Sequence, residues 1–408
     1  MKRLDDCFNL ADFRDAARQR LPSALFHYID GGADDELTVR SNTTAFDHYR
    51  LVPNYLRSIS DITTDRTVFG CHVDWPVLLS PTGLNRAFNP SGEIAVARAA
   101  AEAGTTYALS GMGTTSIEEI GKATTAPKIF QLYLFNDDAL NFALIDRCKA
   151  AGFNVLCLTV DCIAAGNRER DLRCGLTVPP TLNRRNLFGF TRHPLWCLRY
   201  AASERMTMPN IPTTDGNGSI GTLASYFAQK MEQNITWPAV EKLMRRWDGP
   251  FVIKGLQSVA DARDAATAGV SGIIVSNHGG RQLGSAAPTI DLIADIADAV
   301  GDRLDVVMDG GIRRGTHVVK ALAMGARACM IGRPYLYGLS AFGQPGVQRV
   351  LTLLRAEIRR TLALLGCASV DALGHSHIRL ANQIPQFFTH AAGTNADALP
   401  PALLRSSA

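Results

Sequence analysis

Two residues that could carry out chemistry together, His278 and Arg281, lie three positions apart in the segment 276–282, SNHGGRQ. A histidine side chain gains and loses a proton near neutral pH, and an arginine side chain grips a carboxylate through two parallel hydrogen bonds. Such a pair indicates proton removal next to a carboxylate group. Taken alone, the motif could equally be a histidine that caps a strand end beside a solvated arginine.

The elements that must position this segment are strands and helices in alternation. An apolar run, residues 272–275, precedes it and predicts a buried strand. Helical patterns alternate with short apolar runs from about residue 76 to 365, which indicates one α/β unit. Eight parallel strands with intervening helices close into a (β/α)8 TIM barrel. The expected strands are residues 76–81, 105–110, 129–133, 154–161, 251–255, 271–276, 305–309 and 328–332.

Polar side chains recur where these expected strands end. In a (β/α)8 barrel, the catalytic groups gather at the carboxyl ends of the strands. A single such residue could be a capping group or a solvated end, but a polar residue at nearly every exit indicates one shared site. The residues are Thr82, Ser110, Gln131, Tyr133, Thr159, Asp161, Lys254, His278, Arg281 and Asp309.

The last two strand exits predict a phosphate site. The segment 309–315, DGGIRRG, opens a helix, and Gly332-Arg333-Pro334 follows the eighth strand. Glycines let backbone N–H groups approach an anion, and a helix N-terminus and arginines add positive potential. Glycine turns also occur for steric reasons alone. The chain has no Walker-type loop, and the segment 111–116 resembles a dinucleotide loop only loosely.

A flavin mononucleotide, FMN, would supply both the phosphate and an electron acceptor. Lys254 could place positive charge beside the N1–C2 carbonyl of the flavin. A buried lysine without an anionic partner is costly, so such a partner would explain a lysine at a strand end. Ser110, Gln131 and Thr159 are suitable hydrogen-bond partners for the flavin edge.

Composition excludes several other classes of protein. The chain has 408 residues, 46% of them hydrophobic, and a net charge of only +4, without the basic stripe of a nucleic-acid-binding protein. Its nine cysteines are scattered, with no Cys-x-x-Cys pair, which argues against a disulfide framework or a zinc site and favours a reduced, cytoplasmic compartment. We expect no metal, no signal peptide and no membrane-spanning run.

These motifs together resemble the FMN-dependent 2-hydroxy acid dehydrogenases and oxidases. The family includes glycolate oxidase, and the membrane-associated mandelate dehydrogenase and L-lactate dehydrogenase look most similar. The resemblance covers nearly the whole chain. The matching stretches are residues 21–22, 28–33, 81–85, 130–133, 158–161, 252–255, 276–282, 309–311 and 332–334.

The resemblance implies a role for each matching residue. His278 would be the base, Asp161 would stabilise its imidazolium, Arg281 would clamp the substrate carboxylate, and Tyr133 would contact the substrate hydroxyl. Tyr28 and Arg168 would assist Arg281, although Tyr28 alone predicts a packed helix residue and Arg168 lies in a charge run typical of a solvated face. The implied FMN contacts are Thr82, Gly83, Ser110, Gln131, Thr159, Lys254, Ser276, Asp309, Gly310, Gly311, Arg313, Gly332 and Arg333.

Two positions depart from the family pattern. Many members continue Arg-Gln-Leu with aspartate, whereas this chain has Gly284, so the loop or a local ion pair should differ. Met112 occupies a position that is tryptophan in members similar to glycolate oxidase, and a flexible methionine there predicts a roomier substrate pocket. The segment 81–85 looks more like that of mandelate dehydrogenase.

We expect an N-terminal helical extension (1–75), the barrel (76–370) with an insertion at 162–235, and a C-terminal tail (371–408). Within the insertion, residues 181–210 contain five arginines and one acid, interleaved with aromatic and leucine residues. Such a segment could lie on an anionic membrane, as the resemblance suggests, or it could be a lid over the substrate. The arginines are Arg184, Arg185, Arg192, Arg199 and Arg205.

The predicted reaction is oxidation of an (S)-2-hydroxy acid, of the L-lactate or (S)-mandelate type, to the 2-oxo acid. A quinone or other acceptor would then reoxidise the flavin, at the cytoplasmic face of the inner membrane if the insertion binds there. One alternative is an oxidase that uses oxygen and forms hydrogen peroxide. More distant alternatives are an FMN-dependent isomerase on the same barrel and a flavin-binding protein without activity. The resemblance also implies a homotetramer.

Overall fold

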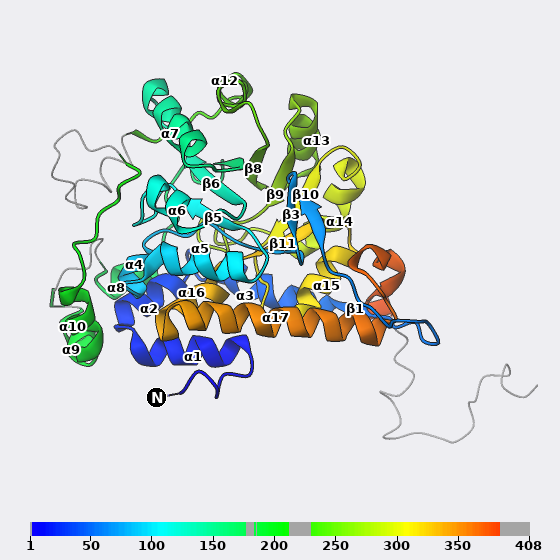
Figure 1. The fold of residues 1–408 in the computed structure, drawn as a ribbon, viewed down its shortest axis with the longest axis horizontal. Coiled ribbons are helices and arrows are strands. Elements are labelled where there is room, and N and C mark those ends of the chain that lie inside the picture. The colour runs from blue at the N-terminus through cyan, green and yellow to red at the C-terminus, as the bar shows by residue number, and fades with distance from the viewer. Residues whose placement is uncertain (1, 177–182, 185, 212–229, 384–408) are drawn as a thin grey trace, which may run out of the picture.

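Eight parallel strands close into a barrel in the computed structural model (Figure 1), in the order β10-β11-β4-β5-β6-β7-β8-β9. The structure describes residues 2–176, 183–184, 186–211 and 230–383. The predicted (β/α)8 fold is therefore confirmed, with each strand near its expected place. The barrel strands are β4 (Val77–Leu79), β5 (Tyr107–Ser110), β6 (Lys128–Tyr133), β7 (Val155–Thr159), β8 (Phe251–Leu256), β9 (Gly272–Val275), β10 (Asp305–Asp309) and β11 (Ala328–Ile331).

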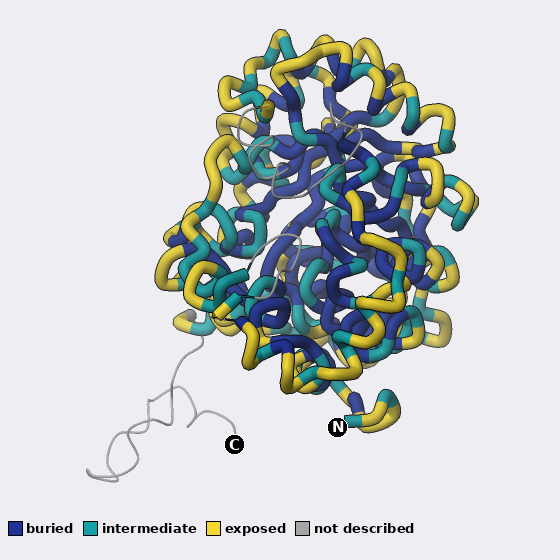
Figure 2. The backbone as a smooth tube through the Cα atoms, turned by 90° about the vertical axis from the view of Figure 1, so that its left-hand side faces the viewer, coloured by how far each residue is buried: buried dark blue, intermediate teal, exposed yellow. Residues whose placement is uncertain are grey.

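Helices follow the strands in the alternation that the sequence predicts, and they surround the barrel. Figure 2 shows the consequence: the strands at the centre are buried, and exposed residues lie mostly on the outer helices and loops. The helices that follow β4 to β11 in turn are α5 (Gly92–Glu102), α6 (Ile117–Ala123), α7 (Asp138–Ala150), α12 (Trp237–Trp247), α13 (Val259–Ala268), α14 (Thr289–Val300), α15 (Gly315–Ala323) and, after β11, α16 (Arg333–Phe342) with α17 (Gln344–Leu365).

Local sequence signals fix where several of these helices begin and end. Ser116 caps the backbone N–H of Glu119 at the start of α6, and the Glu119 side chain caps Ser116 in return. Ser258 caps the start of α13 in a similar way. The same helix ends at Gly269, whose φ of +79° is the left-handed conformation that stops a helix.

A short hairpin closes the floor of the barrel. It consists of β2 (Arg66–Val68) and β3 (Cys71–Val73), which pair antiparallel. Val68, Phe69 and Val73 are buried in one cluster with inward-facing strand residues such as Ile274. A Cβ at Gly272 would lie 2.4 Å from the Phe69 ring, so this strand position needs a residue without a side chain. The hairpin therefore seals the end of the barrel that lies away from the strand exits.

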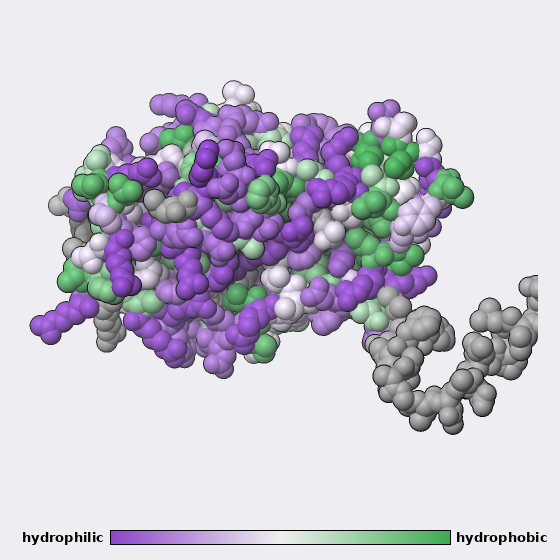
Figure 3. Space-filling model, turned by 90° about the horizontal axis from the view of Figure 1, so that it is seen from below, coloured by the Kyte–Doolittle hydropathy of each residue, from purple (hydrophilic) through white to green (hydrophobic). Residues whose placement is uncertain are grey.

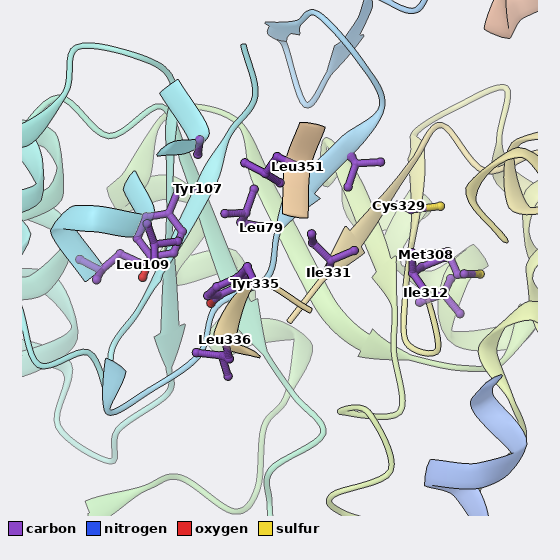
Figure 4. Packing of buried hydrophobic residues seen from close by; sticks show 14 of the residues in the cluster. Leu79, Tyr107, Leu109, Met308, Ile312, Cys329, Ile331, Tyr335, Leu336 and Leu351 are labelled. Carbon is purple, nitrogen blue, oxygen red and sulfur yellow. The ribbon is translucent and has the colours of Figure 1, made fainter. Parts of the chain in front are cut away.

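Three N-terminal helices lie against the outside of the barrel: α1 (Leu10–Arg20), α2 (Ser23–Asp30) and α3 (Leu37–Thr44). The first of them packs on α16, and α17 runs across α5 and α15 (Figure 1). Figure 4 shows how α16 joins the core, with aromatic and aliphatic side chains of strands and helix in one cluster. The labelled members include Leu79, Tyr107, Leu109, Ile331, Tyr335 and Leu336.

Part of the predicted C-terminal tail is ordered against the N-terminal extension. The strand β12 (Ile378–Leu380) pairs antiparallel with β1 (Tyr49–Leu51). Short 3₁₀ turns lie at Ala45–His48, Val370–Ala372, His375–His377 and Ala381–Gln383. Residues 384–408 of the predicted tail lie outside the described residues, so the tail as a whole stays a prediction.

The predicted insertion contains short helices in its described part. These are α8 (Glu169–Arg173), α9 (Leu187–Thr191) and α10 (Pro194–Ala202), and a further short helix, α4 (Asn85–Phe88), follows β4. In Figure 1, α9 and α10 lie at the edge of the molecule, near α2. Arg185 and residues 181–182 of the basic segment lie outside the described residues. Among the described helices, each is too short or too polar to cross a membrane.

We predict that Phe69→Ala lowers the free energy of unfolding by about 3–5 kcal/mol, since it removes a fully buried ring from the barrel floor. Denaturant unfolding of the purified protein, followed by circular dichroism, measures this change. The matched control is Thr67→Ala, two residues away on an exposed position of β2. Equal stability of the two variants would mean that the hairpin does not help to hold the barrel together.

Candidate active site

A cavity of about 500 Å³ opens at the carboxyl ends of the barrel strands. Of the residues predicted for the site, fifteen line this cavity: Tyr28, Thr82, Gly83, Ser110, Tyr133, Arg168, Lys254, His278, Arg281, Asp309, Gly310, Gly311, Arg313, Gly332 and Arg333. Four others do not line it: Gln131, Thr159, Asp161 and Ser276. These four lie behind the wall and contact the side chains or strands that form it.

His278 is held by a carboxylate from another strand. Its Nδ1 lies 3.0 Å from Oδ1 of Asp161, which follows β7. Burial acts to raise the pKa of Asp161, but the attraction of His278 and Lys254, together with hydrogen bonds, lowers this pKa to about 2. The carboxylate therefore stays ionised, as a partner for an imidazolium must.

The backbone around His278 is unusual for a residue with a side chain. The φ of His278 is +55°, in the left-handed region that non-glycine residues rarely adopt. The Gln282 side chain donates to the backbone oxygens of Asp161 and Ala164, at 3.1 and 3.0 Å, and so ties the two loops together. Strained backbone of this kind is found mainly at functional sites.

Lys254 is buried but paired. Its Nζ lies 3.0 Å from Oδ2 of Asp309 and donates to Oγ of Ser276 at 2.7 Å. Although burial opposes the charge of Lys254, Asp309 and Asp161 outweigh burial and raise the lysine pKa. Burial likewise opposes the charge of Asp309, but Lys254 and hydrogen bonds from Ser276 and Ser80 lower its pKa. Both groups are therefore charged, and the Lys254 ammonium lies at the cavity wall with its charge balanced by Asp309.

Arg281 and Arg168 lie close together in the same cavity, and both guanidinium groups lie over the ring of Tyr28. Arg281 donates to the backbone oxygen of Tyr28 at 2.6 Å, and its guanidinium lies 4.8 Å from the centre of the Tyr28 ring. Burial first, and then repulsion by Arg168, lower the pKa of Arg281 to about 10. Among the described residues no carboxylate forms a salt bridge with Arg281, and Arg168 has only Asp171, at 3.9 Å, so Arg281 is the cation that an anionic ligand would pair with.

The position of Tyr28 follows from the ion pairs of Asp30, a buried carboxylate two residues further along α2. Asp30 receives Arg14 at 2.6 Å, Arg170 at 3.2 Å and the hydroxyl of Tyr337 at 2.8 Å. Burial acts to raise the pKa of Asp30, but Arg14 and Tyr337 lower it to about 2. Asp30 thus fixes the end of α2, where Tyr28 meets the two arginines.

The glycine-rich segment after β10 forms one wall of the cavity. Gly310 and Gly311 have φ of +121° and +74°, and a Cβ at Gly311 would lie 1.9 Å from the backbone oxygen of Asn42. Arg313 and Arg333 line the same wall. Arg333 also donates to three backbone oxygens, those of Ile29, Gly279 and Gly31, at 2.7–2.9 Å. The wall thus combines a glycine-rich backbone, which an anion can approach closely, with two cations, as is typical of a phosphate site.

The residues present fit FMN. Gln131 Nε2 and Thr159 Oγ1 are buried and have no hydrogen-bond partner among the described residues. Gln131 accepts from Ser110 at 2.9 Å through its other atom, and Thr159 lies beside Lys254 in the sheet. Buried polar atoms are nearly always satisfied. These two orphaned atoms, the Lys254 cation and the glycine-rich wall together match the ring edge, the N1 side and the phosphate of a flavin.

Some cavity residues were not predicted from the sequence. Ser80 donates to Asp309 at 2.8 Å, and Cys162 lies 3.4 Å from His278 Nδ1. Met231 and Gln233 also line the cavity and come from the insertion. Ser80 could have been found because it ends a strand, whereas nothing in the local sequence marks the other three.

The two departures from the family pattern have structural counterparts. A Cβ at Gly284 would lie 2.3 Å from Oδ2 of Asp34, so an aspartate at position 284 would place two carboxylates against each other. Asp34 is held at this place by Asn167, whose side chain donates to it at 3.1 Å. Met112 lines the cavity, as a residue that shapes the substrate pocket must.

Comparison with known proteins assigns the family. The family model described as FMN-dependent dehydrogenase matches residues 17–380. The chain therefore belongs to the FMN-dependent 2-hydroxy acid dehydrogenase and oxidase family, and its cofactor is FMN. This assignment favours an oxidoreductase over the isomerase alternative.

Individual relatives span several activities. The chain is 37% identical over 384 residues to an L-lactate oxidase from Nostoc sp., covering 93% of this chain and 100% of the relative. It is 35% identical over 381 residues to glycolate oxidase 3 from Arabidopsis thaliana, covering 93% and 98%. Among solved structures, the monotopic membrane protein (S)-mandelate dehydrogenase matches with a TM-score of 0.88 at 35% identity, over 92% of this chain and 100% of that one.

We predict that acid destabilises the protein partly through Asp161. Its pKa of about 2 lies below the ordinary 3.8, so its ionised form stabilises the fold above pH 4 and this contribution is lost as the pH falls toward 2. Between pH 4 and 2, Asp161→Asn should lose about 2 kcal/mol less stability than the wild type. Denaturant unfolding at several pH values measures this, with the exposed Asp302→Asn as control. Identical pH profiles for wild type and Asp161→Asn would contradict it.

Proposed function

We propose that the protein oxidises an (S)-2-hydroxy acid to the corresponding 2-oxo acid. The observation that carries the proposal is one cavity that holds a base paired with a carboxylate, His278 with Asp161, beside an arginine, Arg281, that has no salt-bridge partner among the described residues. A base next to a carboxylate clamp suits removal of a proton from the carbon, or from the hydroxyl, adjacent to that carboxylate.

The substrate carboxylate binds between Arg281 and Arg168, over the ring of Tyr28. Both guanidinium groups face that ring, at 4.8 and 5.5 Å from its centre. A bound carboxylate relieves the repulsion between the two cations and forms paired hydrogen bonds with a guanidinium. Tyr133 lines the same cavity and donates to the substrate hydroxyl or to the oxyanion that develops from it.

His278 takes the substrate proton. Because Nδ1 pairs with Asp161, Nε2 is the ring nitrogen that accepts the proton, and Asp161 stabilises the imidazolium that results. Such acid–base catalysis contributes roughly 10²–10⁴-fold to the rate. The same residues serve whether the proton comes from carbon or from oxygen.

FMN, when bound, accepts two electrons from the substrate and passes them on to a second acceptor. Lys254 would lie at its N1 side, Thr82, Gly83, Ser110, Gln131, Thr159 and Ser276 would surround the ring, and Asp309 would hold Lys254 in place. Gly310, Gly311, Arg313, Gly332 and Arg333 would hold the phosphate.

The cavity lining favours a substrate with an apolar side chain. Met112, Ile163 and Met231 line it, and flexible methionines adapt to groups of different shape. We therefore place the substrate among acids of the L-lactate or (S)-mandelate type. A quinone or another acceptor takes the electrons; oxygen, with formation of hydrogen peroxide, is the second candidate, which the L-lactate oxidase relative supports.

We further propose that α9 and α10 touch an anionic membrane surface. Leu187, Phe188, Leu195 and Leu198 on these helices are 47–66% exposed. Arg184, Arg192, Arg199 and Arg205 lie among them. In Figure 3, hydrophobic side chains lie among hydrophilic ones at the left end, where Figure 1 has α9 and α10. A monotopic membrane protein, (S)-mandelate dehydrogenase, is a structural relative, which supports peripheral contact; we propose the cytoplasmic face of the inner membrane for it. A homotetramer remains part of the proposal.

We predict that one acid among (S)-lactate, (S)-mandelate and glycolate bleaches the flavin absorbance of the FMN-loaded protein in anaerobic stopped flow. Oxygen or a quinone, added afterwards, should restore the band and so distinguish an oxidase from a dehydrogenase.

His278→Gln should retain FMN and reduce the flavin roughly 10²–10⁴-fold more slowly, because it removes the base. Bleaching at the wild-type rate in this variant would overturn the role of His278, and no bleaching by any acid would overturn the reaction.

We predict that the double variant Phe188→Asp/Leu198→Asp binds vesicles containing anionic lipid at least about tenfold more weakly than the wild type. Each exposed apolar side chain gains up to roughly 1.5–3 kcal/mol when it leaves water. Vesicle sedimentation at low and high salt measures this, because salt should weaken the arginine contribution. Leu364→Asp, on an exposed position of α17, is the control. If wild type and double variant sediment alike, α9 and α10 are not the contact.

A further inference from the structure

Cys162 lies at the centre of the proposed active site but has no role in the proposed reaction. It directly follows Asp161, lines the cavity and comes within hydrogen-bond distance of two catalytic groups. We propose that Asp161, Cys162 and His278 form a binding site for a thiophilic divalent cation of the Zn²⁺ type, and that this cation switches the enzyme off. The inhibition, though not the binding, rests on the proposed role of His278 as the base.

The geometry of the three donor atoms is that of a metal site. Cys162 Sγ lies 3.3 Å from Asp161 Oδ1 and 3.4 Å from His278 Nδ1, and the last two atoms lie 3.0 Å apart. All three donors therefore lie within 4.8 Å of one another. Around a tetrahedral Zn²⁺, with bonds of about 2.0–2.3 Å, neighbouring donors of this set are about 3.3–3.6 Å apart. An outward shift of a few tenths of an ångström would accommodate the ion.

The chemistry of the donors points to a soft or borderline cation. A thiolate, an imidazole and a carboxylate are ligands that Zn²⁺ accepts together, with a fourth position left open. Hard cations such as Mg²⁺ prefer oxygen ligands and bind poorly to sulfur. Asp161 also has a second, independent feature: its Oδ2 is buried and has no hydrogen-bond partner among the described residues. A cation at Oδ1 would neutralise this under-satisfied carboxylate.

Nearby positive charge does not rule the cation out. The charge of Lys254 is matched by Asp309 at 3.0 Å. Arg281 and Arg168 line the same cavity; among the described residues Arg281 has no salt-bridge partner and Arg168 has only Asp171, at 3.9 Å, so the two cations favour an anion there. Chloride, hydroxide or the carboxylate of a 2-hydroxy acid can therefore occupy the fourth position on the metal, with the arginines on its outer side. The site takes up a cation together with an anion.

Binding of the metal would inactivate His278 as a base because it changes which ring nitrogen carries the proton. In the free site Nδ1 of His278 carries the proton that Asp161 accepts, and Nε2 is free to take one from the substrate. A metal on Nδ1 moves that ring proton to Nε2, which then has no lone pair for the substrate. The thiol of Cys162 loses its proton to solvent as the Sγ–metal bond forms. No electron transfer is involved.

The thiol should respond to metals rather than to oxidants. Burial, and then the neighbouring Asp161, raise the pKa of the Cys162 thiol, so little thiolate forms without a metal. Oxidation and alkylation both need the thiolate. A bound cation instead compensates the negative charge of the Cys162 thiolate directly. The site is therefore distinct from a peroxide-sensing cysteine.

Equilibrium dialysis of the FMN-loaded, tag-free protein against Zn²⁺ alone, and against Mg²⁺ alone, tests the binding. We expect Zn²⁺ but not Mg²⁺ to bind, and Cys162→Ala and Cys162→Ser to weaken the binding by more than the roughly 10–100-fold that loss of an outer-shell partner costs. Cys174→Ser, at a half-buried cysteine outside the cavity, should bind like the wild type. FMN content shows that each variant is folded. Absence of Zn²⁺ binding, or unchanged affinity in both Cys162 variants, would overturn the site.

Anaerobic flavin reduction tests the inhibition separately. Zn²⁺ at saturating concentration should slow flavin reduction in the wild type at least about tenfold, and a chelator should restore the rate. In each Cys162 variant, Zn²⁺ should leave the rate close to that of the same variant without metal. Zn²⁺ that binds without slowing reduction would overturn the block of His278. If no acid reduces the flavin even without Zn²⁺, the proposed function fails, while the dialysis still decides the metal site.

Discussion

Closure of the ring of parallel strands is the constraint on which the site depends. The last barrel strand returns to the first, because β11 pairs with β4 in parallel from Cys329↔Val77 to Ile331↔Leu79. All eight strands then run the same way, and their carboxyl ends form a single rim. Asp161 and His278, 117 positions apart in the chain, meet on this rim at 3.0 Å.

The buried charges at the rim are stabilised in two different ways. Lys254 and Asp309 satisfy each other, with Ser276 and Ser80 completing the network, so this pair stays charged and fixed without a ligand. Arg281 has no salt-bridge partner among the described residues and donates to the backbone oxygen of Tyr28, and Arg168 has only a long contact of 3.9 Å with Asp171. Both guanidinium groups lie over the ring of Tyr28. The first arrangement keeps the Lys254 ammonium charged at the cavity, where it would lie beside a bound flavin in the proposed function. The second leaves positive charge in the cavity that an anion would neutralise, and the proposed role of the two arginines in binding an acid depends on it.

Much of this could be predicted from the sequence because the signals are local. Short apolar runs marked each barrel strand, and the polar residue after each run marked the rim. The local sequence predicts a packed aromatic for Tyr28 and a solvated charge for Arg168, whereas the family resemblance implies that both contact the substrate. The structure brings both to the cavity because the Asp30 ion pairs fix the end of α2 and the first residues of the insertion, 162–165 and Arg168, line the cavity.

The sequence by itself determined the barrel, the FMN family and the set of residues at the strand exits, since periodicity and short motifs depend on neighbours in the chain. Only the tertiary structure decided which of those residues face the cavity and which support it from behind. It alone placed Cys162 between Asp161 and His278, and it alone set Gly284 against Asp34. Such contacts join distant segments, and their distances follow from how the whole barrel packs rather than from any local pattern.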